Sequence, residues 1–408
     1  MTRPPSPAPS DAPAPSEREL RRLYDRCVAP DLLIGVHPSD RPVAMIIAGQ
    51  PGAGLTFATV NLRKQLIETA TTAPAHVSLN RLRAYHPLWA PGGELSPTAA
   101  ARVADDCQVW FDRFVAEVQE RRLDLIAEME TTDIEAVPRL AIDLQHSGYI
   151  VQAVFVATSR EESRLAMLAR YEMRRRAGLG AEAPSIQAHD HAFNNAASVL
   201  GRMEHERLVD GLRVIAHDGA HIYESRVIGG ELNRVPRAAE SMSVQQDKPP
   251  SSKELAQYAM RWETLVQRLA NDPSVPREIA SQTLQWRNAA VDRCQQDPSA
   301  AQMLQWAREA GAFRVMNRYE FLKEFPHHER AFITLGIAAE ESEKYPTQEA
   351  NRLMFHAREN IAQRIERGDM ARIAARQKAQ DAKAAKSKEA PAKSDPPRQR
   401  PELDPPTR

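Results

Sequence analysis

The chain has few cysteines and no long apolar run. Its three cysteines, Cys27, Cys107 and Cys294, are far apart and odd in number. This pattern fits a reducing compartment and argues against a disulfide framework or a cysteine zinc site. No run approaches the ~18 to 20 apolar residues of a membrane span, and the N-terminal stretch has no apolar core of the kind found in secretory signals. We therefore expect a soluble cytoplasmic protein.

A net charge is also missing. The chain has 54 basic and 54 acidic residues, so its formal charge at pH 7 is zero. Such a chain lacks the positive surplus that favours binding to nucleic acid or to an anionic membrane surface. We therefore expect neither nucleic acid nor a membrane as a partner.

The composition changes several times along the chain. Residues 1–16 are mostly Pro, Ser and Ala and are predicted to be disordered, because they have little to bury. Short apolar runs alternate with longer amphipathic stretches in residues 17–235, which we expect to form one domain. Residues 236–252 are predicted to be a linker, 253–377 a helical domain, and 378–408 a disordered tail rich in Lys, Ala and Pro.

Five short runs in the first domain are predicted strands. They are residues 42–48, 123–128, 149–158, 212–217 and 221–227. Stretches with helical periodicity lie between them. Strands separated by helices indicate a parallel sheet covered on both faces. We therefore predict an α/β domain followed by an all-α C-terminal region.

The stretch "GQPGAGLT", residues 49–56, follows the first predicted strand and precedes a predicted helix. It fits the phosphate-binding pattern G-x-x-x-x-G-K-[ST] except that Leu55 stands in the lysine position. Its three glycines allow the tight path that such a loop needs, and backbone N–H groups at the helix N-terminus would face the anion. Thr56 could place its hydroxyl on Mg²⁺. A Gly/Pro turn without any ligand fits the same residues.

Three further stretches follow this loop in a characteristic order. "VSLNRLRAYHP" (77–87) resembles a strand followed by an acidic position and x-[FL]-R-x-x-H-P, and "LIAEMETTD" (125–133) stands where an apolar strand ends in E-G-T. "HSGYIVQAVFVATSREESRLAMLARYE" (146–172) follows a pattern of G-Y, strand, and a helix ending in R-Y-E. Because the loop and these stretches occur in this order, residues 38–230 resemble the zeta-toxin family. The resemblance implies a P-loop kinase fold that phosphorylates UDP-N-acetylglucosamine and poisons cell-wall synthesis.

The resemblance implies a nucleotide site and a phosphate clamp. The residues that would hold the phosphates of ATP are Gly49, Gln50, Pro51, Gly52, Ala53, Gly54, Leu55 and Thr56. Thr56 would also bind Mg²⁺, and Arg170 falls on the arginine that clamps the transferring phosphate. A second family arginine would fall at Glu182, although the arginines at residues 174–176 leave this register open.

The resemblance also implies a sugar pocket. Asn80 falls where the family has the aspartate that takes the proton from the sugar hydroxyl. Arg83, with His86 and Pro87, would shape the pocket, and Glu128 would contact the sugar. Strand-end acids in α/β folds point into the crevice where ligands bind, which independently favours Glu128 as a contact. From the residues alone, His86 is better explained as a structural residue beside Pro87.

Two positions depart from what phosphoryl transfer needs. Leu55 brings no charge to the phosphate oxygens, and Lys64 lies too far along the same helix to replace it, roughly 13 Å away. Asn80 can orient a hydroxyl but cannot accept its proton at neutral pH. A base contributes roughly 10²- to 10⁴-fold in rate, and one charge-stabilising group roughly 10²- to 10³-fold. We therefore predict a protein that still binds ATP and has weak or no kinase activity.

Two other functions fit the sequence. One is an active zeta-type kinase in which groups from the helical region replace the missing lysine and base. The other is an interaction protein that works through residues 253–377. Members of the family are commonly held in check by a small helical antitoxin, so an antitoxin-like protein is a candidate partner, beside a nucleotide and a nucleotide sugar.

The stretch "FPHHE", residues 325–329, contains two adjacent histidines, His327 and His328. Adjacent side chains diverge on a helix. The sequence therefore gives little reason to expect a metal site there.

Overall fold

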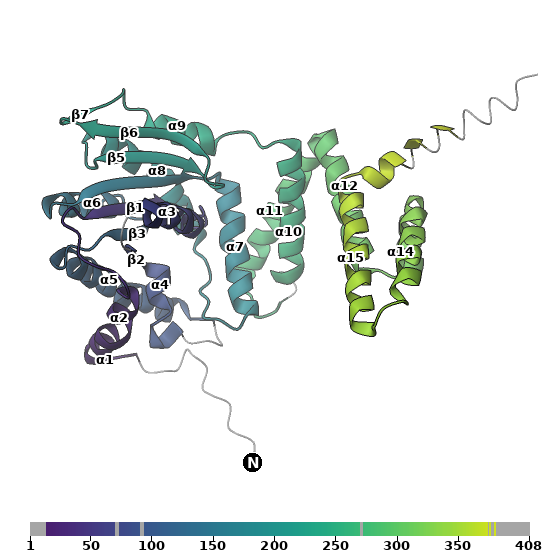
Figure 1. Cartoon of the computed structure of the whole chain (residues 1–408), viewed down its shortest axis with the longest axis horizontal. Helices are drawn as coiled ribbons and strands as arrows, with labels where there is room; N and C mark the ends of the chain where they lie inside the picture. Colours follow the sequence, from purple (N-terminus) through teal and green to yellow (C-terminus); the bar gives the residue numbers. More distant parts are fainter. Residues whose placement is uncertain are drawn as a thin grey trace, which may run out of the picture. The chain divides into compact units, whose positions relative to one another are not determined.

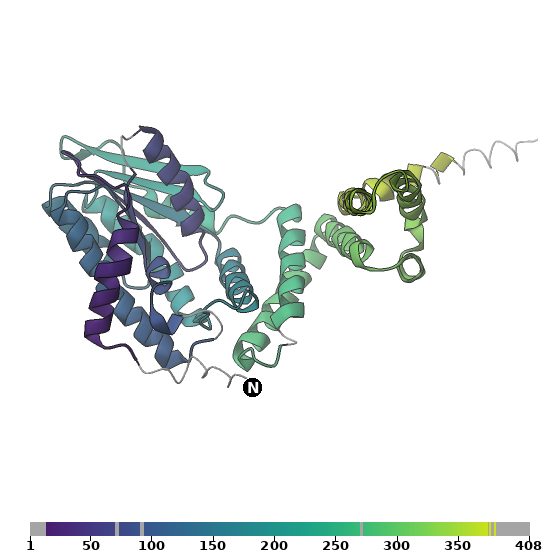
Figure 2. The same ribbon diagram turned by 60° about the horizontal axis from the view of Figure 1, so that its bottom comes forward.

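The computed structural model of the chain describes residues 14–69, 73–89, 94–269, 272–373, 375–376 and 379–380 (Figures 1 and 2). The chain folds into two compact units. The first unit contains the residues up to 251 together with Arg261–Val291, and the second contains Ser252–Met260 and the residues from Asp292 onward. The segments predicted to be disordered lie outside the described residues, apart from 14–16 and 379–380.

The first unit contains a seven-stranded sheet with the order β2-β3-β1-β4-β5-β6-β7. The strands are β1 (Val43–Gly49), β2 (Ala75–Ser78), β3 (Leu125–Glu130), β4 (Ile150–Ala157), β5 (Gly211–Ala216), β6 (His221–Ile228) and β7 (Glu231–Leu232). Strands β1 to β5 pair in parallel, whereas β6 and β7 are antiparallel additions at one edge. The predicted α/β fold is confirmed.

Helices cover both faces of this sheet. The helices of the first unit are α1 (Glu17–Leu23), η2 (Tyr24–Val28), α2 (Ala29–Leu32), α3 (Leu55–Thr69), α4 (Leu79–Arg83), η3 (Pro87–Trp89), α5 (Pro97–Glu120), α6 (Ala136–His146), α7 (Arg160–Arg176), α8 (Ile186–His205) and α9 (Ala238–Gln246), with parts of α10 (Ser252–Leu269) and α11 (Arg277–Gln296). Side chains alternate along β1: Ile46 belongs to a large core with α5, α6, α8 and α9, and Ile47 to a smaller core with α3. This alternation explains why β1 is apolar along its whole length.

The segment predicted to be a linker, residues 236–252, contains helix α9. Ala238, Met242 and Gln246 are spaced four residues apart and are buried on one face of this helix. Its first backbone N–H, on Ala238, donates a 2.8 Å hydrogen bond to the buried carboxylate of Glu204. The prolines and serines around α9 are typical of a linker, but the apolar four-residue spacing within it gives a helix that packs on the core.

The second unit is helical, as predicted for the C-terminal region. It contains α12 (Pro298–Val315), α13 (Arg318–Glu324), η4 (Pro326–His328), α14 (Glu329–Ser342) and α15 (Thr347–Glu366), and helices α10 and α11 run across the division between the units. Phe313, Phe321 and Phe332 meet in its core, with ring centroids 5.0 to 5.6 Å apart. The division between the units differs from the predicted boundary before residue 253, since residues 261–291 group with the sheet.

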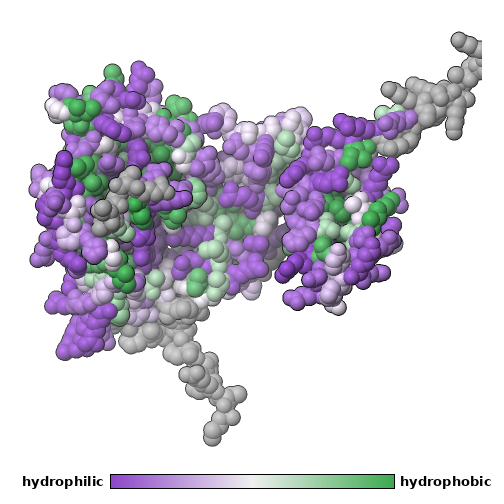
Figure 3. Space-filling view, in the orientation of Figure 1, coloured by the Kyte–Doolittle hydropathy of each residue, from purple (hydrophilic) through white to green (hydrophobic). Residues whose placement is uncertain are grey.

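Hydrophilic side chains cover most of the face seen in Figure 3, and apolar side chains gather in smaller areas. Among the described residues, no helix combines the length and the apolar character that crossing a membrane requires.

Candidate functional site

Four parallel strands end at one edge of the sheet and carry the candidate residues. Strand β1 ends at Gly49, beside Glu130 at the end of β3, and Ser78 at the end of β2 lies beside Glu128. The loop 49–56 follows β1, helix α4 follows β2, and α7 follows β4 (Figure 1). Because carboxyl ends of parallel strands form the ligand-binding edge of α/β sheets, this edge is the place to look for a site.

The loop after β1 turns tightly through two glycines with left-handed backbone. Gly52 and Gly54 have φ values of +80° and +98°, which a side chain would strain. A Cβ atom on Gly52 would stand 2.1 Å from the carbonyl oxygen of Ser163 in α7. The loop leads directly into α3, whose first residue is Leu55. Backbone N–H groups at this helix start are therefore free to face an anion.

Buried polar groups hold this loop against β4 and α7. The Gln50 side chain is fully buried, and its Nε2 donates a 2.9 Å hydrogen bond to the carbonyl of Thr158. In return, the Thr158 hydroxyl donates a 2.8 Å bond to the carbonyl of Ala53. Gln50, placed among the phosphate-binding residues by resemblance, thus contributes its side chain to the support of the loop.

The side chain of Leu55 packs into the smaller core. It contacts an apolar cluster that includes Met45, Ile47 and Ala58. One of its methyl groups, Cδ2, lies 3.3 Å from where a Cβ of Gly49 would be, so the side chain lies across the base of the loop. The position that holds lysine in the phosphate-binding pattern therefore contributes apolar packing and no charge.

The hydroxyl of Thr56, at the end of the loop, lies beside the carboxylate of Glu128 in β3. The Thr56 hydroxyl is 3.4 Å from Oε2 of Glu128, and Oε1 of Glu128 is 2.7 Å from Nε2 of His76. Arg81 lies 3.1 Å from the other nitrogen of His76, so this nitrogen accepts and Nε2 donates to Glu128. Burial raises the pKa of Glu128, but His76, Thr59 and Thr56 together outweigh it, so the pKa is lowered. Glu128 therefore stays ionised beside Thr56.

A cavity of about 250 Å³ opens beside the loop and brings together most of the other candidates. The lining residues that the sequence predicted or left open are Pro51, Gly52, Asn80, Arg83, Arg170, Arg174 and Glu182. Nη1 of Arg83 donates a 3.4 Å bond to Oδ1 of Asn80, and Nη2 of Arg83 pairs with Glu182 at 3.4 Å. Asn80 and Glu182 are thus both oriented by one arginine.

The charge of this cavity is dominated by arginines. Burial, together with the positive charges of Arg170 and Arg83, holds the pKa of Arg174 below its usual value. In the part of the chain that the structure describes, Arg170 makes no hydrogen bond or ion pair. Arg83, Arg170 and Arg174 face this cavity, and the two glutamates that line it do not neutralise all three guanidinium charges. Such a cavity suits an anion.

Glu130 also lines the cavity, and the sequence analysis missed it. Glu130 stands at the exposed end of β3, and its pKa is raised by desolvation in the cavity and by the charge of Glu182, while Arg83 and Arg170 act in the opposite direction. Glu130 lies two residues after Glu128 on the same strand, so both side chains point to the same face. The stretch Glu130-Thr131-Thr132 matches E-G-T at its first and third positions, and this alternative register was the signal that could have identified Glu130.

His86 does not line the cavity. Its ring is buried, and burial lowers its pKa against the opposing effect of Asp106, whose carboxylate is 3.1 Å from Nε2. The Leu88 backbone N–H donates to its Nδ1 at 3.2 Å, and the Trp89 N–H donates to its carbonyl at 2.9 Å. His86 therefore fixes the turn that carries Trp89 into the cavity wall, which agrees with the structural alternative.

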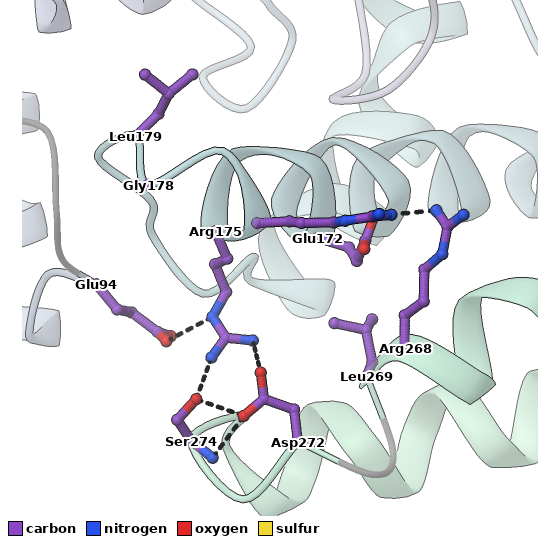
Figure 4. Close-up of a pocket in the computed structure, with 10 residues that line it drawn as sticks. Glu94, Glu172, Arg175, Gly178, Leu179, Arg268, Leu269, Asp272 and Ser274 are labelled. Carbon is purple, nitrogen blue, oxygen red and sulfur yellow. Dashed lines mark hydrogen bonds and ion pairs between the residues drawn. The ribbon is translucent and has the colours of Figure 1, made fainter. Parts of the chain in front are cut away.

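Arg175 belongs to a second cavity, of about 600 Å³. It points between Glu94 and Asp272, with a 3.2 Å ion pair to each (Figure 4). Of the three arginines at residues 174–176, Arg174 alone faces the same cavity as Arg170. Among the positions considered for the second family arginine, Arg174 and Glu182 both line that cavity.

Comparisons with known proteins show which family and which relatives this chain is similar to. The family model described as Zeta toxin matches residues 32–228. The toxin PezT of Streptococcus pneumoniae is 24% identical over 194 residues, which are 47% of this chain and 75% of PezT. The toxin zeta of Enterococcus hirae is 25% identical over 202 residues, 48% of this chain and 68% of that protein.

A solved structure from a characterisation of the PezAT toxin–antitoxin system of S. pneumoniae has the same fold. It aligns with a TM-score of 0.50 at 19% identity and covers 62% of this chain and 98% of its own. The matched residues include the loop 49–56, the end of β3 with Glu128 and Glu130, and helix α7 with Arg170. Residues 32–228 of the chain are thus similar in sequence and in fold to the zeta toxin family.

Proposed function

We propose that the first unit binds ATP and has weak or no kinase activity, so that it acts as a binding or regulatory module. The observation that carries this proposal is the side chain of Leu55, which packs in the apolar cluster of the smaller core. Phosphoryl transfer depends on positive groups around the β and γ phosphate oxygens and on a base that orients the nucleophile. Leu55 supplies no positive charge, and Asn80 cannot act as a base.

The remaining residues of the loop suit a nucleotide. The positive φ angles of Gly52 and Gly54 turn backbone N–H groups toward the start of α3, where phosphates bind in such loops. The adjacent oxygens of Thr56 and Glu128 are of the kind that Mg²⁺ prefers. When bound, the ion would supply charge to the phosphate oxygens. The arginines of the cavity would hold the anionic part of a second ligand, which the family resemblance implies to be a nucleotide sugar.

Leu55→Lys is expected to tighten ATP binding by about tenfold, because a charge-assisted contact to phosphate contributes roughly 1.5 kcal/mol or more. Calorimetry with ATP and Mg²⁺ measures this. The matched control is Val60→Lys, which adds the same charge to an exposed position of α3. Equal affinity in Leu55→Lys and the control would mean that the loop does not bind phosphates.

A second candidate function is a slow kinase that uses Glu130 as its base. It is favoured by the raised pKa of Glu130 and by its place in the cavity with Asn80 and Arg170. An ionised carboxylate whose pKa is raised is a stronger base. Any turnover of the unmodified chain with ATP and UDP-N-acetylglucosamine should then fall by roughly 10²-fold or more in Glu130→Gln. Turnover that survives this change would exclude Glu130 as the base.

We also propose a protein partner of the antitoxin kind, since the solved structure with the same fold comes from work on a toxin–antitoxin system. Purification from the native host at native expression should return the chain in a complex of defined stoichiometry. Recovery of the free chain alone would contradict this proposal.

A further inference from the structure

Three side chains of the kinds that can bind a metal ion lie close together in the second unit, far along the chain from the zeta-toxin-like region. Nε2 of His328 lies 2.8 Å from Oε2 of Glu309, and Nε2 of His327 lies 3.5 Å from the same oxygen. The two imidazole rings are neighbours, with centroids 4.2 Å apart. The expectation that adjacent histidines diverge was wrong here, because they lie in the short 3-10 turn η4 and not within an α-helix.

A second hydrogen bond orients the carboxylate of Glu309 toward the two histidines. Glu309 lies in α12, and its other oxygen, Oε1, accepts a 3.0 Å hydrogen bond from Nε2 of Gln305, one turn earlier. This bond leaves Oε2 facing the two imidazoles. Carboxylates that bind metals are commonly held by such a second hydrogen bond, which orients the ligand oxygen.

We propose that Glu309, His327 and His328 form a binding site for a divalent transition-metal ion, with Zn²⁺ as the best fit. Ligand atoms at about 2.0 to 2.1 Å from a tetrahedral Zn²⁺ lie about 3.3 Å apart. The two nitrogen–oxygen distances, 2.8 and 3.5 Å, lie on either side of that value. All three ligand atoms lie within 4.8 Å of one another, so a small movement of one ring completes the geometry.

The choice of metal follows from the ligands and their surroundings. Two imidazoles and one carboxylate suit Zn²⁺, whereas Mg²⁺ and Ca²⁺ prefer sites built from oxygens alone. Glu309 and His328 are buried, and the ring of His328 lies 5.8 Å from that of Phe321 in the aromatic core. The side chain of His327 is 49% exposed, so it can move and gives the ion a way in. Three protein ligands leave a fourth position for water or for a ligand from a partner.

Titration of the full-length chain with Zn²⁺, after removal of metals by a chelator, tests the site. Calorimetry should show one tight site, and saturating Zn²⁺ should raise the unfolding temperature. His327→Gln should weaken this site by roughly 10- to 100-fold or more, since loss of even an outer partner costs that much. Because His327 is half exposed, this variant should fold normally in the absence of metal.

The control is His356→Gln, which removes an exposed histidine of α15 in the same unit and should leave the tight site unchanged. A second variant, Glu309→Gln, keeps the size of the side chain and should also abolish tight binding. Co²⁺ should give the absorption spectrum of a tetrahedral site in the unmodified chain and lose it in His327→Gln. Equal Zn²⁺ affinity in the unmodified chain, His327→Gln and His356→Gln, or no stoichiometric binding, would overturn the proposal.

Discussion

The double variant Leu55→Lys, Asn80→Asp is expected to phosphorylate UDP-N-acetylglucosamine at least about 10²-fold faster than either single variant. The lysine would neutralise charge on the phosphates, and the aspartate would orient and deprotonate the sugar hydroxyl. Each single variant should gain little, because groups that act on one transition state are strongly non-additive. Initial rates with ATP and Mg²⁺, measured for all four proteins, give the comparison.

The arginine cavity provides the control for this experiment. Arg170→Ala in the double variant should remove the gain, since Arg170 lines the cavity beside Asn80. Arg176→Ala removes an exposed arginine from the same helix, outside that cavity, and should preserve the gain. High activity of Leu55→Lys alone would instead mean that Glu130 already serves as base. A double variant as inactive as the unmodified chain would mean that the pocket has changed beyond these two positions.

Gly52→Ala is expected to destabilise the first unit severely and to abolish nucleotide binding. The left-handed backbone at φ +80° costs alanine about 1 to 2 kcal/mol. The added Cβ would also stand 2.1 Å from the Ser163 carbonyl oxygen, so the loop or α7 must move. We expect a total loss of about 3 kcal/mol or more in the free energy of unfolding. Thermal or denaturant unfolding measures the loss, and calorimetry with ATP measures binding.

Gly148→Ala is the matched control for this change. Gly148 has a nearly identical φ of +78°, and a Cβ there would have no atom within 4 Å. It should therefore show the backbone cost alone, about 1 to 2 kcal/mol. If both variants lose the same stability, the close approach between the loop and α7 does not constrain the fold.

The sequence predicted the sheet well where strands are long and apolar. The runs that became β1, β3, β4 and β5 are buried on both faces, so they stand out without any periodicity. Strand β2, with a histidine at its second position, is short and polar enough to be recognised only through the family resemblance. The sequence analysis did not predict helix α9, because the prolines and serines around it are typical of a linker. Only three buried residues, spaced four apart, indicate the helix.

The site was predicted less completely than the fold. Asn80, Arg83 and Arg170 line one cavity because the parallel strands that precede them, β2 and β4, end at the same edge of the sheet. Glu130 was missed because two acids occur two residues apart on β3, and sequence alone does not say which one reaches the cavity. The convergence of His327 on Glu309 depends on a 3-10 turn, which changes the direction of adjacent side chains in a way that a helical pattern does not predict.

The packing of Leu55 has a consequence for how long the protein survives in the cell. A lysine at the start of α3 would meet the positive end of the helix dipole and would depend on a bound anion to offset that charge. Leu55 instead contacts the apolar cluster whether or not an anion is present. A ligand that binds only the folded state protects it in proportion to its concentration and affinity. Because this packing does not depend on a bound anion, we expect the turnover of this protein by proteases to depend little on the supply of ATP.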